Sequence, residues 1–151
     1  MRGNFVKKRL LFIVAAIIAT LFIFSNSLQE ASISDQKSDF FVDFIADEIR
    51  EAGHSPRRLY ITRAVRKTAH VLEFALQGLL ITGCFSAPRK RRILYILLLG
   101  LLTGCVDEFI QLFTPGRSAM IQDVFVDFFG TVIGVLTFGI LTRIKRKLKK
   151  G

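Results

Sequence analysis

Four long apolar runs, separated by basic or polar segments, limit how this chain can fold. About 20 apolar residues are enough for a helix to cross the hydrocarbon core of a bilayer. The runs predict transmembrane helices at residues 10–28, 68–87, 93–113 and 120–141. Of the 151 residues, 51% are hydrophobic, which is more than a soluble domain of this length would carry. We therefore expect an all-α membrane protein.

The first apolar run, at residues 10–24, also has the form of a secretory signal peptide, because a basic segment precedes it. However, no A-x-A-like cleavage site follows the run. Three further spans also need an anchored and oriented start. We therefore expect a retained first helix that reaches Leu28.

The basic residues cluster between the apolar runs and predict the topology. Fourteen lie in the N-terminal segment, the 89–92 turn and the C-terminal tail. The other eight lie in the 29–67 segment and in the turn between the third and fourth apolar runs. Basic residues are enriched in cytoplasmic loops, so both termini and the 89–92 turn are predicted to be cytoplasmic. This clustering differs from the basic surface of a nucleic-acid-binding domain, and we expect no nucleic-acid partner.

An amphipathic helix is predicted at residues 38–52, outside the cytoplasm. Its apolar residues recur at helical spacing on one side, and its acidic residues take the other. The apolar side comprises Phe40, Phe41, Phe44, Ile45 and Ile49; the acidic side comprises Asp39, Asp43, Asp47, Glu48 and Glu51. Ser38 suits the N-cap and Gly53 the C-terminal stop. The helix either lies on the membrane surface or over the bundle, or only packs within a loop.

Polar residues gather at the outer ends of three predicted spans. They fall at helical spacing and so share a face on each helix. They are His70, Glu73 and Gln77 on the second span, Asp107, Glu108 and Gln111 on the third, and Asp123 and Asp127 on the fourth. Glycines continue two of these faces, Gly100 and Gly104 on the third span and Gly130 and Gly134 on the fourth, in a pattern that lets helices approach closely. The three faces are predicted to form one outward-opening pocket.

The predicted pocket contains five carboxylates but only Arg117 and His70 as clear cationic partners, with Arg66 and Lys67 close by. Crowded carboxylates in a low dielectric need a cation or must share protons. A divalent ion such as magnesium, manganese or zinc, held by Glu73, Asp107 and Asp127, would satisfy them. A cationic ligand group or a shared-proton network would do so as well. Alternatively, the polar residues only hold the helices together by hydrogen bonds.

The segments RKTAHVLEFALQGLL (66–80), DEFIQLFTPGRS (107–118) and QDVFVDFFGTVIG (122–134) resemble the VanZ-like family of small bacterial membrane proteins. FSNSLQE, at residues 24–30, is a weaker match. The resemblance implies a single multi-pass domain over residues 1–151, in the bacterial cell membrane. Some members carry His at the position of Ile110, so a mechanism that uses that His would not transfer. The family's namesake is associated with resistance to glycopeptide antibiotics of the teicoplanin type.

Three functions stay open at this point. In the first, the pocket binds a lipid phosphate or cell-wall precursor in the bilayer, and resistance follows from altered surface lipids or competition with the drug. In the second, the pocket hydrolyses or transfers a group on a lipid-linked phosphate. The third is a small proton-coupled transporter. For the first, the expected ligand-binding residues are Glu108, Gln111, Arg117, Ser118, Asp123 and Asp127; for the second, the expected catalytic residues are His70, Glu73 and Asp107.

Overall fold

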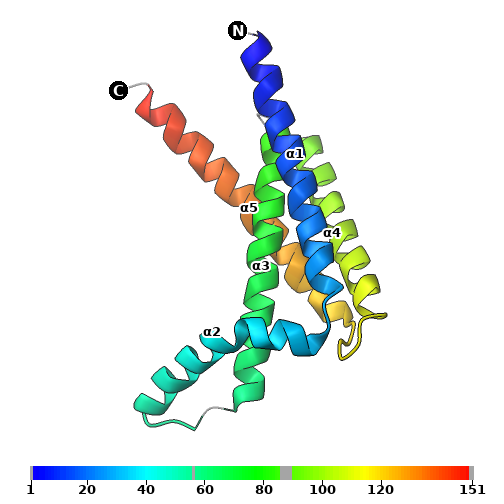
Figure 1. Cartoon of the computed structure of the whole chain (residues 1–151). Helices are drawn as coiled ribbons and strands as arrows, with labels where there is room; N and C mark the ends of the chain where they lie inside the picture. Colours follow the sequence, from blue (N-terminus) through cyan, green and yellow to red (C-terminus); the bar gives the residue numbers. More distant parts are fainter. Residues whose placement is uncertain (1, 56, 86–89, 150–151) are drawn as a thin grey trace.

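The protein consists of α-helices. The computed structural model describes residues 2–55, 57–85 and 90–149, which form α1 (Arg2–Ser27), α2 (Ala31–Glu51), α3 (Arg58–Cys84), α4 (Lys90–Gln111) and α5 (Ile121–Leu148). In Figure 1, α1, α3, α4 and α5 form an elongated bundle, and α2 lies across one end of it. Both chain termini lie at the other end. The predicted all-α class is confirmed.

Three of these helices are long and apolar enough to cross a membrane, namely Val6–Ser27 within α1, Arg91–Gln111 within α4, and Ile121–Leu148, which is α5. The surfaces of these helices that face away from the bundle expose large apolar side chains, such as Leu102, Phe129 and Leu136, each 60% exposed. An apolar surface of this extent is unfavourable in water and suits contact with lipid. The chain is therefore a multi-pass membrane protein.

Helix α3, which contains the predicted second span, is not among the three apolar helices identified in the described part of the chain. It packs against all four other helices. Such a central position lets a helix carry polar side chains, because neighbouring helices can provide hydrogen-bond partners. α3 is also longer at its N-terminal end than predicted, beginning at Arg58, and it ends at Cys84. The predicted end of this span, at Ala87, lies outside the described residues.

The glycines on α5 allow it to pack closely on α3. A Cβ atom at Gly130 would lie 2.6 Å from the carbonyl oxygen of Val71, and one at Gly134 would overlap the carbonyl oxygen of Ala75. On α4, a Cβ at Gly104 would meet the side chain of Asp127 at 3.3 Å. The predicted small-residue faces are therefore the surfaces at which these helices meet.

Helix α2 differs from its prediction in its start and in its buried face. It begins at Ala31, so Ser38 lies within the helix, where its hydroxyl donates to the carbonyl of Asp35. The predicted stop is confirmed, because Gly53 follows the helix with a φ of 82°. The face packed against Ile61 of α3 consists of Val42 and Ala46, whose small side chains allow the two helices to approach.

The phenylalanines of α2 face away from this contact with α3. Phe40, Phe41 and Phe44 are 76%, 59% and 60% exposed. The nearby acidic residues, Asp39 and Asp43, instead pair with Arg58 at the start of α3. These hydrogen bonds raise the pKa of the Arg58 guanidinium. The phenylalanines of the predicted apolar side are thus exposed, whereas Ile49 from that side packs beside Val42 and Ala46 at the contact with α3.

Candidate functional site

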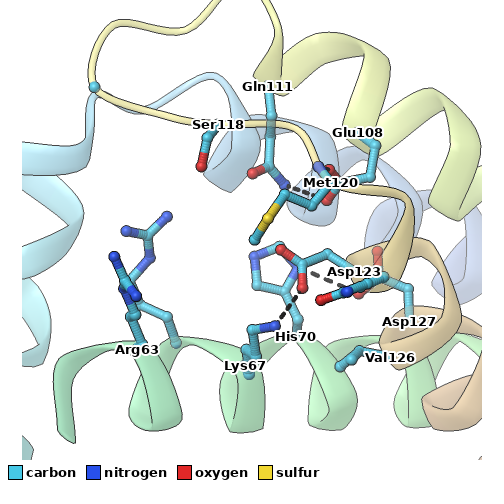
Figure 2. A pocket seen from close by; sticks show the side chains of 13 residues that line it. Arg63, Lys67, His70, Glu108, Gln111, Ser118, Met120, Asp123, Val126 and Asp127 are labelled. Atoms are coloured by element: carbon cyan, nitrogen blue, oxygen red, sulfur yellow. Dashed lines mark hydrogen bonds and ion pairs between the residues drawn. The ribbon is translucent and has the colours of Figure 1, made fainter. Parts of the chain in front are cut away.

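A pocket of about 530 Å³ lies between α3, α4, α5 and the loop that joins α4 to α5 (Figure 2). In Figure 1 this loop lies at the end of the bundle opposite the termini. Its lining residues divide by charge. Arg63, Arg66, Lys67 and His70 come from α3, whereas Glu108, Asp123 and Asp127 come from α4 and α5. Gln111, Ser118 and Gln122 add uncharged polar side chains to the lining, and Met120 and Val126 add apolar ones.

We call the side of the pocket formed by Arg63, Arg66, Lys67 and His70 of α3 the cationic wall. Residues three, four and seven positions apart lie on one face of a helix. Arg63, Lys67 and His70 therefore project from α3 in one row, as Figure 2 shows. Lys67 crosses the pocket to pair with Asp123 of α5, with Nζ 2.5 Å from Oδ1. Arg66 is 3.7 Å from Asp35 of α2. Among the described residues Arg63 forms no ion pair, and its guanidinium is free for a ligand.

Asp107 is fully buried and joins three helices. Its Oδ1 accepts a 2.6 Å hydrogen bond from the hydroxyl of Ser27 at the end of α1. Its Oδ2 accepts a 2.9 Å hydrogen bond from Nε2 of Gln111 and lies 3.8 Å from Nδ1 of His70 on α3. A buried carboxylate is stable only with such partners. Asp107 is therefore both part of the site and a structural connection between α1, α3 and α4.

His70 lies between two buried carboxylates. Its Nδ1 is 3.6 Å from Oδ1 of Asp127 and 3.8 Å from Oδ2 of Asp107. One ligand atom from each of these three residues lies within 4.8 Å of the other two. Asp127 is 1% exposed, and its Oδ2 has no hydrogen-bond partner among the described residues. We call His70, Asp107 and Asp127 the HDD cluster.

Glu73 points to a different set of partners. Its Oε1 accepts a 2.8 Å hydrogen bond from Nδ2 of Asn26 on α1, and it lines a second cavity of about 220 Å³. His70 and Arg66 line both cavities. The metal site predicted from sequence consisted of Glu73, Asp107 and Asp127. The compact cluster in the described part of the structure contains His70 in the place predicted for Glu73.

Glu108 forms hydrogen bonds with the α4–α5 loop and with its own helix. Glu108 accepts a 2.8 Å hydrogen bond from the backbone N–H of Met120, just before α5, and a 3.3 Å bond from Gln111. It therefore anchors the loop that closes the pocket. Ser118, on that loop, is exposed and lines the pocket. The structure thus brings Glu108, Gln111, Ser118 and Asp123, all predicted ligand-binding residues, to one pocket. Glu108 also holds the backbone of the loop through its hydrogen bond with Met120.

Arg117 does not line the larger pocket with these residues but lines the smaller cavity. Its Nε and one terminal nitrogen donate 3.2 Å hydrogen bonds to the carbonyls of Gln29 and Asn26. Burial, followed by the nearby Arg66, lowers the pKa of the Arg117 guanidinium. Gly116, before it, has a φ of 73°, which the turn requires. Arg117 therefore connects the α4–α5 loop to the last turn of α1 and to the segment that follows it.

We expect Arg117→Ala to lower the free energy of unfolding by about 2–4 kcal/mol, because two charge-assisted hydrogen bonds are lost. The measurement is thermal or denaturant unfolding of the detergent-solubilised protein. Arg63→Ala provides the control, because it removes an exposed arginine and should change stability by about 0.5 kcal/mol or less. Equal stability of both variants would contradict the structural role of Arg117.

Three contributors to the site were not selected from sequence. In the sequence, Asn26 and Ser27 belong only to the weaker FSNSLQE match, and Arg63 is only one of the eight basic residues of the outward-facing segments. The row of Arg63, Lys67 and His70 at helical spacing could have indicated a cationic face of α3. No periodic pattern could have paired Ser27 with Asp107, which is 80 residues away.

A comparison with family models finds a match to the one described as VanZ/LLP1 over residues 12–142, which is most of the chain. The matched region includes α3, α4, most of α1 and of α5, and the entire pocket. No curated protein and no solved structure matches the chain significantly.

Proposed function

The chain belongs to the VanZ/LLP1 family. From this premise we propose that it binds the phosphate-bearing head group of a lipid or cell-wall precursor at the extracytoplasmic surface of the cell membrane. The single observation that carries the proposal is the cationic wall of the large pocket. Arg63, Arg66 and Lys67 face a space of about 530 Å³ at one end of a membrane bundle. Arginine side chains bind phosphate oxygens through charge-assisted hydrogen bonds. In this proposal they replace Arg117 as the phosphate ligand.

The proposed topology has four spans, α1, α3, α4 and α5, with both termini in the cytoplasm of a bacterial cell. Two observations support it. The termini lie together at the end of the bundle opposite α2 and the pocket (Figure 1). Fourteen basic residues belong to the terminal segments and the 89–92 turn, which the positive-inside tendency assigns to the cytoplasm. The pocket and α2 then face outward.

In this arrangement, the exposed phenylalanines of α2 lie near the lipid head groups. Only three residues separate α2 from the end of α1 at Ser27, so the start of α2 lies at the level where α1 leaves the bilayer. Aromatic and apolar side chains on one face of a helix favour insertion into that interface. A head group could then reach the pocket from the outer leaflet.

The binding experiment uses farnesyl diphosphate as a short phosphate-bearing lipid and farnesol as its uncharged counterpart. We expect the purified protein in uncharged detergent to bind farnesyl diphosphate by calorimetry more tightly than farnesol. Arg66→Gln should weaken the binding of farnesyl diphosphate about tenfold or more, because it removes a charged hydrogen-bond donor.

The control variant is Arg50→Gln on α2. Arg50 is exposed, pairs with Asp47 and does not line either cavity. It should leave binding unchanged. Equal affinity for farnesol and farnesyl diphosphate, or unchanged binding in Arg66→Gln, would contradict the proposal.

We further propose that the protein contributes to resistance against glycopeptide antibiotics of the teicoplanin type, as the sequence resemblance implies. A pocket that binds a cell-wall precursor or a surface lipid would change the target or the access of such a drug. The test compares teicoplanin susceptibility of a deletion strain that carries the wild-type chain with one that carries Arg66→Gln. Wild-type protection without protection by Arg66→Gln supports the link, and equal protection contradicts it.

A second candidate function is hydrolysis or transfer at the bound phosphate. His70 between two carboxylates favours it, because such an imidazole can hold and transfer a proton beside the cationic wall. The farnesyl diphosphate experiment also tests this function, by measuring release of inorganic phosphate. Release by the wild type but not by His70→Gln supports chemistry, whereas binding without release leaves the binding function alone.

A further inference from the structure

We propose that the HDD cluster binds a divalent transition-metal ion, with Zn²⁺ the best fit, through His70 Nδ1, Asp107 Oδ2 and the carboxylate of Asp127. This site differs from the Glu73-containing triad that the sequence predicted. It is independent of head-group binding, since its ligands all come from the chain. The inference rests on ligand chemistry, on the distances between ligand atoms, and on an unpartnered oxygen of Asp127.

The distances suit a small, four-coordinate ion. Zn²⁺ binds imidazole nitrogen and carboxylate oxygen at about 2.0–2.2 Å, so neighbouring ligands of a tetrahedral site lie about 3.4 Å apart. The imidazole nitrogen of His70 lies 3.6 Å from the Asp127 oxygen and 3.8 Å from the Asp107 oxygen. These two distances exceed the tetrahedral value by only a few tenths of an ångström. Three protein ligands would leave a fourth position for water or for an oxygen of a ligand in the pocket.

The second observation is the unsatisfied side chain of Asp127. It is 1% exposed, lines the large pocket, and has no hydrogen-bond partner for Oδ2 among the described residues. A buried carboxylate oxygen without a partner is costly. Lys67, on the same face of α3 as His70, is already paired with Asp123, as Figure 2 shows. A metal ion would compensate both Asp127 and Asp107.

The surroundings orient one of the ligands. Ser27 donates to Oδ1 of Asp107, which leaves Oδ2 directed toward His70. Gln111 donates to this same Oδ2 at 2.9 Å, and a carboxylate oxygen has a further lone pair for a metal. Hydrogen bonds of this type hold metal-binding carboxylates in position in many proteins. The two donors, Ser27 and Gln111, are the last residues of α1 and α4.

The experiment is equilibrium dialysis of the chelator-treated, detergent-purified full chain against Zn²⁺, with metal counted by mass spectrometry and unfolding temperature measured in parallel. We expect about one Zn²⁺ per chain and a rise in unfolding temperature on binding. Asp127→Asn and His70→Gln should weaken binding about tenfold or more. Asp127→Asn is the informative variant, since the Oδ2 atom makes no hydrogen bond that the amide would remove.

Two further variants separate this site from its alternatives. Asp123→Asn removes a carboxylate of the same pocket that is paired with Lys67, and it should bind Zn²⁺ as the wild type does. Glu73→Gln should also bind normally, whereas loss there would favour the triad with Glu73. The proposal is overturned if the folded wild type binds no Zn²⁺, or if Asp127→Asn and His70→Gln, folded by their unfolding transitions, bind it as well as Asp123→Asn does.

Discussion

Gly134→Ala is expected to destabilise the protein by about 1–3 kcal/mol or more, through overpacking where α5 crosses α3. An added Cβ would overlap the carbonyl oxygen of Ala75 and would lie 2.6 Å from the backbone nitrogen of Leu79. Both atoms belong to the backbone of α3, so no side chain can rotate to make room. The two helices would have to separate, and the pocket between them would widen.

Gly139→Ala is the matched control for this substitution. Gly139 lies on the same helix, and nothing lies within 4 Å of a Cβ built there. The control should retain or slightly raise stability, because alanine favours helix over glycine. The measurement is the unfolding temperature of the two variants in the same detergent. Similar unfolding temperatures would show that α3 and α5 do not pack as closely as the structure has them.

Asp107→Ala is expected to lower the free energy of unfolding by about 3–5 kcal/mol, a cost typical of breaking a buried charged network. The substitution would leave the hydroxyl of Ser27 and the amide of Gln111 without their acceptor in a buried site. It would also remove one of the two carboxylates beside His70. Denaturant unfolding in detergent, followed by circular dichroism, measures the loss.

Asp123→Ala tests whether any carboxylate of the pocket would have the same effect. The ion pair of Asp123 with Lys67 is partly exposed, with side-chain exposures of 24% and 43%. Exposed ion pairs contribute about 0–1 kcal/mol, so the variant should unfold close to the wild type. If Asp123→Ala and Asp107→Ala lose the same stability, Asp107 does not have the special structural role that its hydrogen bonds indicate.

The two sets of variants separate the stability of the bundle from its ligand binding. Gly134→Ala and Asp107→Ala are expected to act on folding, whereas Arg66→Gln is expected to act on phosphate binding with little change in stability. A stable Arg66→Gln protein that fails to bind farnesyl diphosphate would therefore support the pocket assignment directly. Asp127→Asn stands between the two sets, because its side chain is buried but one of its oxygens is unpartnered.

Several features of the candidate site could be predicted from the sequence because they repeat at helical spacing. Five of the predicted polar residues line one pocket, namely His70, Glu108, Gln111, Asp123 and Asp127. Glycines such as Gly130 and Gly134 lie where helices approach closely. Period and composition determine which residues share a face of a helix. They also determine that ionisable groups in apolar helices gather on the inside of a bundle.

The rotation of each helix relative to its neighbours could not be predicted in this way. α2 turns Val42 and Ala46 toward α3 and exposes the phenylalanines that the pattern placed on its apolar side. Glu73 turns to Asn26 and leaves His70 with Asp107 and Asp127. Arg117, expected in the pocket, lines a neighbouring cavity and donates to the carbonyls of Asn26, at the end of α1, and Gln29. Each of these outcomes depends on contacts between segments far apart in the chain.

The sequence by itself determined an all-α membrane protein with one polar end and closely packed glycine faces, because apolar length and helical period are local properties. Only the tertiary structure decided which polar groups meet. It placed Ser27 on Asp107, Asn26 on Glu73 and the cationic row of α3 opposite the acidic residues of α5. The physical reason is that hydrogen bonds and ion pairs act over a few ångströms, so they depend on the packing of whole helices.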